Sequence, residues 1–327
     1  MSKRIVFEKT GGPEVLALRD VEVGEPGPGE VRVIQYAVGL NYIDTYHRTG
    51  LYPAPLPSGI GMEGAGIVDA LGEGVGDLKA GDRVAYAGGP LGAYADVRIM
   101  PADRLVRLPD SISFEQGAAM MLKGLTAQYL LRRTYRVQAG DTILVHAAAG
   151  GVGLIVCQWA KALGATVVGT VGSEAKAQLA AANGCDHPIV YTRENFADRV
   201  REITGGEGVP VVYDSVGKDT FVASLSCLRP LGMMVSFGNA SGVVPPFDIG
   251  ELSRRGSLFL TRPSLMHYVA KRSDLLETAA DLFSVVDKGT VTIEIKQRYP
   301  LADAAQAHRD LEARSTTGSS VLLPERD

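Results

Sequence analysis

The sequence predicts an α/β protein in which a doubly wound parallel sheet is joined to a second, β-rich domain. Between about Leu125 and Gly238, helix-like and strand-like runs alternate, which is the pattern of a parallel sheet covered by helices. The first third of the chain instead contains short β-like runs separated by Gly/Pro clusters, typical of a small barrel or sandwich. A length of 327 residues also favours two domains over one.

In the first third, the β-like runs fall at residues 5–7, 16–23, 31–38, 64–70, 83–87 and 94–99. A helix is then expected to begin at Ser113, because Gln116 follows three residues later and the pair forms a capping-box signature.

Five strands are expected in the alternating region, at residues 142–146, 166–170, 187–191, 209–214 and 231–237, with residues 256–261 as the candidate for a sixth. The tail predicts a helix over 274–287, a strand over 292–296, a helix over 302–313 and a strand over 320–323. These last elements are expected to rejoin the first domain.

Composition places the chain among ordinary globular proteins, because 46% of its residues are hydrophobic and 21% are charged. No apolar run approaches the length of a bilayer span, and charge returns within a few residues of the N-terminus, which favours the cytoplasm. The net charge of −4 argues against a polyanionic partner such as nucleic acid. Three widely spaced cysteines favour buried thiols over disulfides.

Residues 146–153, with the sequence HAAAGGVG, connect the first strand of the alternating region to a helix. Ala148, Gly150 and Gly153 occupy the three glycine positions of a dinucleotide-binding turn. Gly150 lets the backbone approach a pyrophosphate, and Gly153 permits close packing of helix on strand. The alternative is an ordinary glycine-rich connection, but the strand and helix on either side favour a nucleotide site.

Ligands of such sheets bind beyond the carboxyl ends of the strands. Several residues that follow the expected strands should therefore lie in the same crevice as the turn: Gly172, Ser173, Tyr191, Ser215, Gly238 and Asn239.

The end of the second strand favours NADPH over NADH. NAD-binding sheets place an acid there for the ribose hydroxyl, whereas this chain has Gly172 and Ser173. Lys176 stands in the first turn of the next helix, where the helix dipole disfavours a cation, so an anion is expected nearby. Tyr191 is expected to flank the adenine or the same phosphate. Glu174 is the opposing observation, since it is an acid close to the diagnostic position.

Several spaced motifs together resemble the NADPH-dependent quinone oxidoreductases. These proteins are the zeta-crystallin-like, zinc-free branch of the medium-chain dehydrogenases/reductases, and the resemblance runs from end to end. It rests on residues 41–46 (NYIDTY), 50–53 (GLYP), 80–84 (AGDRV), 146–153 (HAAAGGVG) with 157–161 (CQWAK), 212–217 (VYDSVG) and 235–239 (VSFGN).

The resemblance implies a GroES-like catalytic domain formed by residues 1–122 and 264–327, and a Rossmann NADP-binding domain at 123–263. It also implies a cleft that holds the nicotinamide, and a homodimer. In it, Asn41, Tyr46 and Tyr52 border the nicotinamide and the acceptor, although packing roles for the tyrosines and a capping role for Asn41 remain alternatives. The implied cofactor contacts are Tyr42, Asp44, Thr126, Tyr129, Ala149, Gly150, Gly151, Val152, Gly172, Ser173, Lys176, Tyr191, Ser215, Phe237, Gly238, Asn239, Ser264 and Arg314.

No metal is expected. Zinc-containing relatives carry a cysteine where this chain has Asn41, and a histidine where it has Met62. Amide and thioether groups are poor zinc ligands, and the five histidines are scattered singly. Glu63 is left without a metal and is expected to contact a backbone group or an arginine.

The predicted function is transfer of reducing equivalents from NADPH to a quinone. A reductase of alkenals or enones would use the same cofactor and remains an alternative. A structural or RNA-binding role, known among zeta-crystallin-like proteins, is the alternative of another class; the intact glycine turn argues against it.

Overall fold

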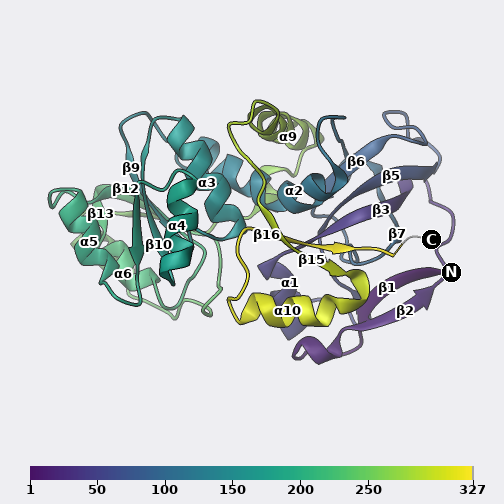
Figure 1. The fold of residues 1–327 in the computed structure, drawn as a ribbon, viewed down its shortest axis with the longest axis horizontal. Helices are drawn as coiled ribbons and strands as arrows, with labels where there is room; N and C mark the ends of the chain where they lie inside the picture. The colour runs from purple at the N-terminus through teal and green to yellow at the C-terminus, as the bar shows by residue number, and fades with distance from the viewer. Residues whose placement is uncertain (326–327) are drawn as a thin grey trace. The chain divides into compact units, whose positions relative to one another are not determined.

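The computed structural model describes residues 1–325, which form two compact units (Figure 1). Unit 1 comprises residues 1–125, 269–287 and the chain from 293 onward. Unit 2 comprises residues 126–268 and 288–292. None of the described helices is long and apolar enough to cross a membrane.

Unit 2 contains a six-stranded parallel sheet in the order β11-β10-β9-β12-β13-β14. The chain starts at β9 and builds outward first to one side and then to the other, so the order reverses between β9 and β12. This reversal is the topological switch point at which doubly wound sheets bind nucleotides. The strands are β9 (Thr142–His146), β10 (Thr166–Val171), β11 (His187–Val190), β12 (Val209–Asp214), β13 (Leu228–Ser236) and β14 (Phe259–Thr261).

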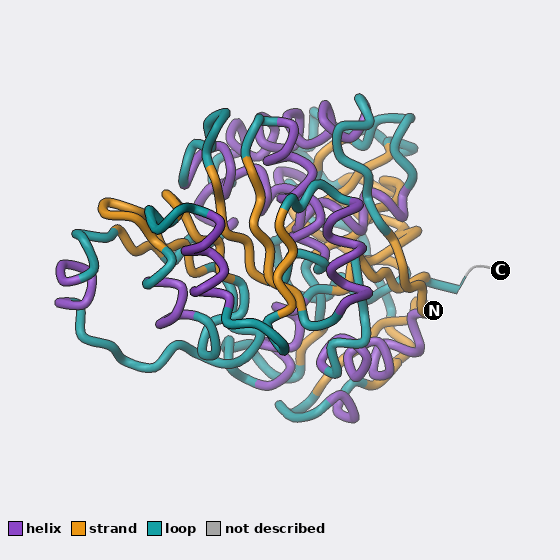
Figure 2. The backbone as a smooth tube through the Cα atoms, turned by 60° about the vertical axis from the view of Figure 1, so that its left-hand side comes forward, coloured by secondary structure: helices purple, strands orange, loops and turns teal. Residues whose placement is uncertain are grey.

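Helices line both faces of this sheet (Figure 2). α3 packs against β9 and β10, α4 against β10 and β11, and α6 against β12 and β13. Apolar side chains from three adjacent strands, Leu144, Val168 and Val212, are fully buried between these layers. The helices are α3 (Gly151–Ala162), α4 (Glu174–Ala182), α5 (Phe196–Ile203), α6 (Phe221–Leu225), α7 (Gly250–Arg254) and α8 (Leu265–Tyr268).

Unit 1 contains a larger, mostly antiparallel sheet in the order β15-β16-β3-β5-β6-β8, with β7 also paired to β3. β16 pairs with β3, so the C-terminal tail completes a sheet begun by the N-terminal third. The strands are β3 (Glu30–Leu40), β5 (Glu63–Leu71), β6 (Arg83–Ala87), β7 (Val97–Pro101), β8 (Val106–Arg107), β15 (Ile295–Pro300) and β16 (Ser319–Leu323).

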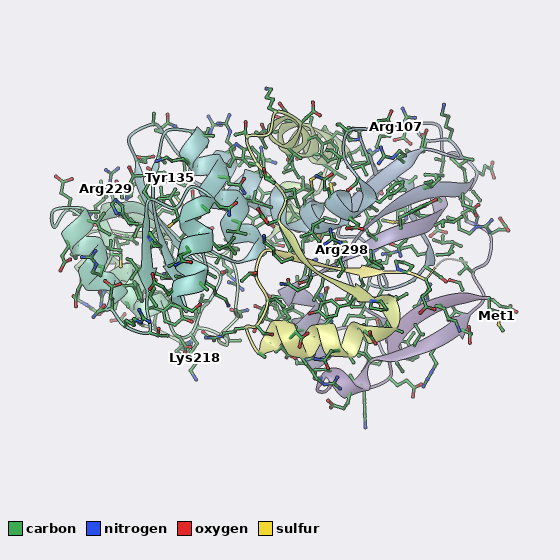
Figure 3. All side chains as sticks on the ribbon, viewed as in Figure 1. Met1, Arg107, Tyr135, Lys218, Arg229 and Arg298 are labelled. Carbon is green, nitrogen blue, oxygen red and sulfur yellow. The ribbon has the colours of Figure 1, made fainter. Side chains whose placement is uncertain are left out.

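A small sheet of β1 (Ser2–Phe7), β2 (Ala17–Val21) and β4 (Ser58–Gly59) accompanies it. The main helices of unit 1 are α1 (Tyr42–Thr49), α9 (Arg272–Asp287) and α10 (Ala304–Glu312), and α2 (Phe114–Tyr129) begins in this unit. Arg298, on β15, donates to Glu115 at the start of α2 with a distance of 2.7 Å from Nε to Oε2 (Figure 3). Short 3₁₀ turns occupy Pro13–Val15, Ala102–Arg104 and Leu301–Asp303, and a π-turn, Leu130–Thr134, follows α2.

The predicted capping box is confirmed at the start of α2. Ser113 N donates to Gln116 Oε1 at 2.9 Å, and Gln116 N donates to Ser113 Oγ at 3.2 Å. The three cysteines are buried and free, also as predicted.

Five strand predictions are wrong by three residues at their starts, and two of these strands begin earlier than expected, at Ser2 and at Leu228. The strand expected at 94–99 begins only at Val97, because Tyr94 N is bonded to Ile60 O outside the sheet. The strand expected at 292–296 is shifted to β15, because the side chain of Gln158 accepts from Thr292 N at 2.7 Å. The sixth parallel strand starts late, since Ser257 adopts a left-handed φ of 56°.

Candidate functional site

The glycine turn follows β9 and is shaped by its backbone. Ala147 adopts a left-handed φ of 54°, a conformation that costs about 1 to 2 kcal/mol for a residue with a side chain. Ala148 N donates to Thr170 O on the neighbouring strand at 3.0 Å. A Cβ atom at Gly153 would lie 2.3 Å from the carbonyl oxygen of Ala147, so only glycine fits there. The turn therefore brings the start of α3 against the end of β9.

Gly150 is the N-cap of α3 and has extended backbone angles. The first amides of any helix have no acceptor within the helix, and they point outward along its axis. Four predicted cofactor residues, Ala149, Gly150, Gly151 and Val152, lie at this helix start. The arrangement can hold a diphosphate through backbone N–H groups and the helix dipole.

The predicted residues at the ends of β10 and β11 are brought together. A Cβ atom at Gly172 would lie 3.0 Å from the hydroxyl oxygen of Tyr191. Ser173 is the N-cap of α4, and its Oγ accepts from Lys176 N at 3.4 Å. Ser173 and Tyr191 thus supply a hydroxyl and a phenol beyond the strand ends, and Lys176 lies in the first turn of α4.

Glu174, the acid that argued against NADPH, is paired with Arg193. The distance from Arg193 NH1 to Glu174 Oε2 is 3.3 Å, and both side chains are exposed. Arg193 was not predicted, because it lies three residues past β11 with no motif around it. It brings a second cation close to the start of α4 and offsets the charge of Glu174.

Asp214, at the end of β12, organises the loop that contains Ser215. Its Oδ1 accepts from Val216 N at 2.7 Å and from Gly217 N at 3.1 Å, and its Oδ2 accepts from Thr220 Oγ1 at 2.8 Å. Because the carboxylate receives all three donors, the loop is held in one conformation at the carboxyl edge of the sheet.

The loop after β13 lies directly against this one. Ala240 N donates to Ser215 O at 3.2 Å, and a Cβ atom at Gly238 would lie 2.3 Å from the same oxygen. Arg262 NH1 donates to Gly238 O at 2.9 Å. The predicted residues Ser215, Phe237, Gly238 and Asn239 are thereby adjacent, and Ser264 follows two residues after Arg262.

Tyr129 and Thr126 lie near the end of α2, in unit 2. Tyr129 is buried and its ring stacks on Tyr268, with centroids 4.4 Å apart. Burial raises the pKa of the Tyr129 phenol, so it is neutral at physiological pH. The cofactor contacts expected of Thr126 and Tyr129 stay predictions.

His146 is a structural residue of the β9 end. It is fully buried, and its two ring nitrogens lie 2.8 Å from Thr170 Oγ1 and 2.8 Å from Ser224 Oγ. Burial lowers the pKa of its imidazole, so the ring is neutral and bridges β9, β10 and α6. It carries no charge toward a phosphate.

In unit 1, Asn41 caps helix α1 and is held by a buried carboxylate. Asn41 Nδ2 donates to Glu63 Oε2 at 2.7 Å, and Leu122 N donates to Glu63 Oε1 at 2.7 Å. Lys123 Nζ lies 3.3 Å from Glu63 Oε2 and 3.1 Å from Leu40 O. Glu63 therefore has the backbone partner expected of it, with a lysine in place of an arginine.

Burial raises the pKa of Glu63, and the nearby ammonium of Lys123 opposes that shift. Lys123 was not predicted. The available signal was a single cation inside the apolar run 118–125, where a buried charge needs a partner.

Asp44 is the second buried carboxylate beside Asn41. Its Oδ2 accepts from Asn41 N at 2.9 Å and from the Tyr94 hydroxyl at 2.8 Å. Burial raises its pKa to about 7. These contacts are internal to unit 1, and the cofactor contact expected of Asp44 stays a prediction.

Three predicted tyrosines form an aromatic cluster on and after α1. The rings of Tyr42 and Tyr46 are 5.8 Å apart, and those of Tyr46 and Tyr52 are 5.2 Å apart in an edge-to-face contact. His47 is partly buried, with its ring 5.7 Å from that of Tyr52. The cluster supplies flat apolar surface with phenolic hydroxyls at its edge.

Arg314 follows α10 and adopts a left-handed φ of 57°. Burial raises the pKa of Tyr42, and the charge of Arg314 opposes that shift, so these two predicted residues share one electrostatic environment.

Among the described residues, no group of three or more His, Cys, Asp or Glu side chains could hold a metal ion. The side chain of Met62 is buried, and the amide nitrogen of Asn41 is engaged by Glu63. The expected independence from metal stays a prediction.

Comparison with known proteins gives the family. Residues 27–110 match the alcohol dehydrogenase GroES-like domain, and residues 151–284 match the zinc-binding dehydrogenase family. A quinone oxidoreductase of Pseudomonas aeruginosa is 58% identical over 99% of this chain and 100% of its own length. A 2-haloacrylate reductase of a Burkholderia species is 48% identical over 98% of both chains.

The crystal structure of an Escherichia coli quinone oxidoreductase complexed with NADPH superposes with a TM-score of 0.97 at 53% identity. That match covers 98% of this chain and 100% of the other. The GroES-like and Rossmann assignments are thereby confirmed, and the chain belongs to the quinone oxidoreductases of the medium-chain dehydrogenase/reductase family.

Proposed function

We propose that this protein is an NADPH:quinone oxidoreductase. The observation that carries the proposal is the full-length identity of 53 to 58% with proteins named quinone oxidoreductases, one of them solved with NADPH. The ends of β9, β10, β12 and β13 in unit 2 supply the features that such a cofactor requires. When bound, NADPH supplies the hydride.

The glycine turn fits a dinucleotide. The 2.3 Å approach that a Cβ would make at Gly153 shows how closely helix and strand pack, and the first amides of α3 suit the diphosphate. Ser173 and Lys176 would hold the 2′-phosphate, with Tyr191 beside them. The backbone of Phe237 to Asn239 would meet the nicotinamide carboxamide.

Residues of unit 1 would receive the quinone. Tyr46 and Tyr52 offer an aromatic surface against which a flat ring can pack, and their hydroxyls can bond a developing oxyanion. In this proposal the tyrosines bind and orient the acceptor. The reduced oxygens can take their protons from water.

We also propose that catalysis needs no metal. Asn41 offers only an amide oxygen and Met62 only a thioether, both poor zinc ligands beside thiolate and imidazole, and the Asn41 side chain is held by its bond to Glu63. Activity should survive exhaustive chelation. One tightly held zinc per chain, removed together with activity, would contradict this.

The experiment that tests the function is an acceptor panel with NADPH and NADH at matched concentrations. Quinones reduced faster than enones, with NADPH preferred, would support the proposal. The second candidate is an enone reductase, favoured by the relative named 2-haloacrylate reductase. Enones that outrun all quinones by kcat/KM would establish that alternative.

A homodimer is proposed from the edge of the unit 2 sheet. β14 ends the strand order, and Phe259 and Leu260 on it are exposed, at 56% and 37%. An edge strand with apolar side chains can pair with a second copy. Light scattering should give twice the chain mass, and Phe259→Lys should lower it; a wild-type monomer at micromolar concentration would contradict the proposal. A cytoplasmic location stays a prediction of the sequence.

A further inference from the structure

Four buried side chains of unit 1 form a hydrogen-bonded chain from α10 to α1, two helices that lie side by side (Figure 1). Arg48 NH1 lies 3.1 Å from His308 Nδ1, and His308 Nε2 lies 3.1 Å from the Tyr94 hydroxyl. The Tyr94 hydroxyl lies 2.8 Å from Asp44 Oδ2. All four side chains are at most 1% exposed.

While Asp44 is ionised, the donors in this hydrogen-bonded chain can be arranged in only one way. A guanidinium has no acceptor, so Arg48 donates and His308 Nδ1 accepts. Burial and Arg48 lower the pKa of His308 to about 3, so the ring is neutral and its hydrogen lies on Nε2. His308 therefore donates to Tyr94, and Tyr94 donates to the carboxylate of Asp44.

This arrangement holds the Asp44 carboxylate in place and does not transfer protons. Passing a proton toward Asp44 would require Arg48 to give one up, and a guanidinium stays protonated in proteins. At the other end, Asp44 Oδ2 also accepts from Asn41 N at 2.9 Å. Asp44 thus joins the hydrogen-bonded chain to Asn41, the N-cap residue of α1.

We propose that Tyr94 and His308 are positioning residues of the acceptor site. They orient the Asp44 carboxyl, which in turn fixes the backbone of Asn41 at the start of α1. This inference rests on the proposed function, in which Asn41 and the tyrosines of α1 border the reacting groups. The sequence around residues 94 and 308 carries no motif that indicates such a role.

The Arg48 end of the hydrogen-bonded chain is anchored by two further contacts. Arg48 NH2 donates to Glu312 Oε1 at 2.6 Å, and Arg48 Nε donates to Gly11 O at 3.1 Å. The bond to Glu312 ties the last turn of α10 to α1. Asn41 is consequently held at two points, through its side chain by Glu63 and through its backbone by Asp44.

Removing the Tyr94 hydroxyl should loosen the second of these points. The carboxylate of Asp44 would lose a donor that stabilises its charge. Its pKa should therefore rise further than burial alone raises it. Protonated Asp44 is a weaker acceptor for Asn41 N than the carboxylate. The charged or titratable groups that act on Asp44 are Tyr94, Lys123 and Glu63, and His308 and Arg48 follow along the chain.

The test compares Tyr94→Phe with Tyr86→Phe. Both tyrosines are fully buried in the same apolar core, and each hydroxyl donates to one side chain, Asp44 for Tyr94 and Gln35 for Tyr86. Deleting the Tyr86 hydroxyl is therefore the matched control for losing a buried hydrogen bond outside the proposed chain. The quantities measured are kcat against pH at saturating NADPH, and the dissociation constant of NADPH from fluorescence.

For Tyr94→Phe we expect kcat to fall roughly tenfold, with the NADPH dissociation constant unchanged within about twofold. The acidic limb of its kcat profile should move to higher pH, and the limb of Tyr86→Phe should not move. His308→Gln keeps an N–H that can reach Tyr94 and should retain more of kcat than His308→Leu. This second pair decides the question if Tyr94→Phe does not fold.

Equal losses of kcat in Tyr94→Phe and Tyr86→Phe, with the acidic limb of neither kcat profile displaced, would overturn the inference. Equal kcat values for His308→Gln and His308→Leu would also overturn it. Failure of the proposed function appears separately, in the wild-type protein. If wild type reduces enones and not quinones, the same variant ratios are measured on an enone and still decide the role of Tyr94 and His308.

Discussion

The glycine turn of unit 2 and the Asn41 cluster of unit 1 are held together by different interactions. The Asn41 cluster comprises Asn41, Asp44, Arg48, Glu63, Tyr94, Lys123 and His308. At the turn, space and backbone hydrogen bonds decide the structure, as the left-handed Ala147 and the tightly packed Gly153 show. Around Asn41, the structure depends on two buried carboxylates, Glu63 and Asp44, and their partners. Under the proposed function, a cofactor common to many enzymes would meet a generic backbone site, and the acceptor side would depend on individual polar side chains.

The two carboxylates themselves differ in their partners. Glu63 has an ammonium, that of Lys123, 3.3 Å from its Oε2. Asp44 has a phenol and a backbone amide, and burial raises its pKa to about 7. One carboxylate is therefore held as an ion pair, and the other sits near the point of protonation at physiological pH.

The largest effect is expected from breaking the ion pair. Lys123→Met leaves Glu63 buried without a cation, which should lower the free energy of unfolding by about 3 to 5 kcal/mol. Adding Glu63→Gln to Lys123→Met removes the unpaired charge and should recover most of that loss. Urea denaturation of the single and double variants measures both values. A double variant as unstable as Lys123→Met would show that the pair is not the cause.

The second carboxylate should make stability depend on pH. The folded pKa of Asp44, about 7, lies above the usual value of 3.8, so the folded state binds the proton more tightly. Its contribution to stability is fully present below pH 4 and is lost as pH rises through 7. Asp44→Asn should remove that decline, by an amount on the order of a few kcal/mol. Parallel Tm curves for wild type and variant between pH 4 and 8 would contradict the shifted pKa.

At the turn, a single methyl group should be enough to damage the site. Gly153→Ala places a Cβ against the Ala147 carbonyl oxygen and should weaken NADPH binding roughly 10- to 100-fold, since one displaced contact to phosphate costs about 1.5 to 3 kcal/mol. Gly76→Ala is the control, because nothing lies within 4 Å of the added Cβ. Fluorescence titration with NADPH measures both, and equal affinities would mean that the turn tolerates the methyl group.

The charge at the start of α4 should decide between the cofactors. Lys176→Ala would remove the proposed charge-assisted contact to the 2′-phosphate and should weaken NADPH roughly 10- to 100-fold while leaving NADH nearly unchanged. Glu174→Gln removes a negative charge from the same first turn of α4 and should not weaken the binding of NADPH. Equal losses of NADPH and NADH in the Lys176 variant would refute its assignment to the phosphate.

The smallest effect is expected at the tyrosines of the acceptor site. Tyr46→Phe and Tyr52→Phe keep the ring contact between these side chains and should keep most of kcat. The corresponding alanine variants should chiefly raise the KM for quinone, because they remove binding surface. A fall of ~100- to 1,000-fold in kcat for either Phe variant would identify its hydroxyl as a catalytic group.

The same contrast explains how far the sequence could be interpreted. The turn, the strand alternation and the Ser113–Gln116 cap are local patterns, and spacing alone predicts them. The Asn41 cluster joins side chains from positions 41 to 308, and buried polar contacts between distant segments leave no period in the sequence. Asp44 was assigned to the cofactor by resemblance alone, and its bond to Tyr94 was not predicted. The displaced strand at β15 has a similar cause, a side-chain contact from Gln158.

The most direct test of the account is a steady-state assay of the metal-depleted protein with NADPH and NADH, each against a short-chain quinone and an enone. The account predicts that chelation leaves the rate unchanged, that kcat/KM is higher with NADPH than with NADH, and that the quinone is reduced faster than the enone. A rate that disappears with the metal, or an NADPH-treated protein that leaves the quinone oxidised, would contradict it.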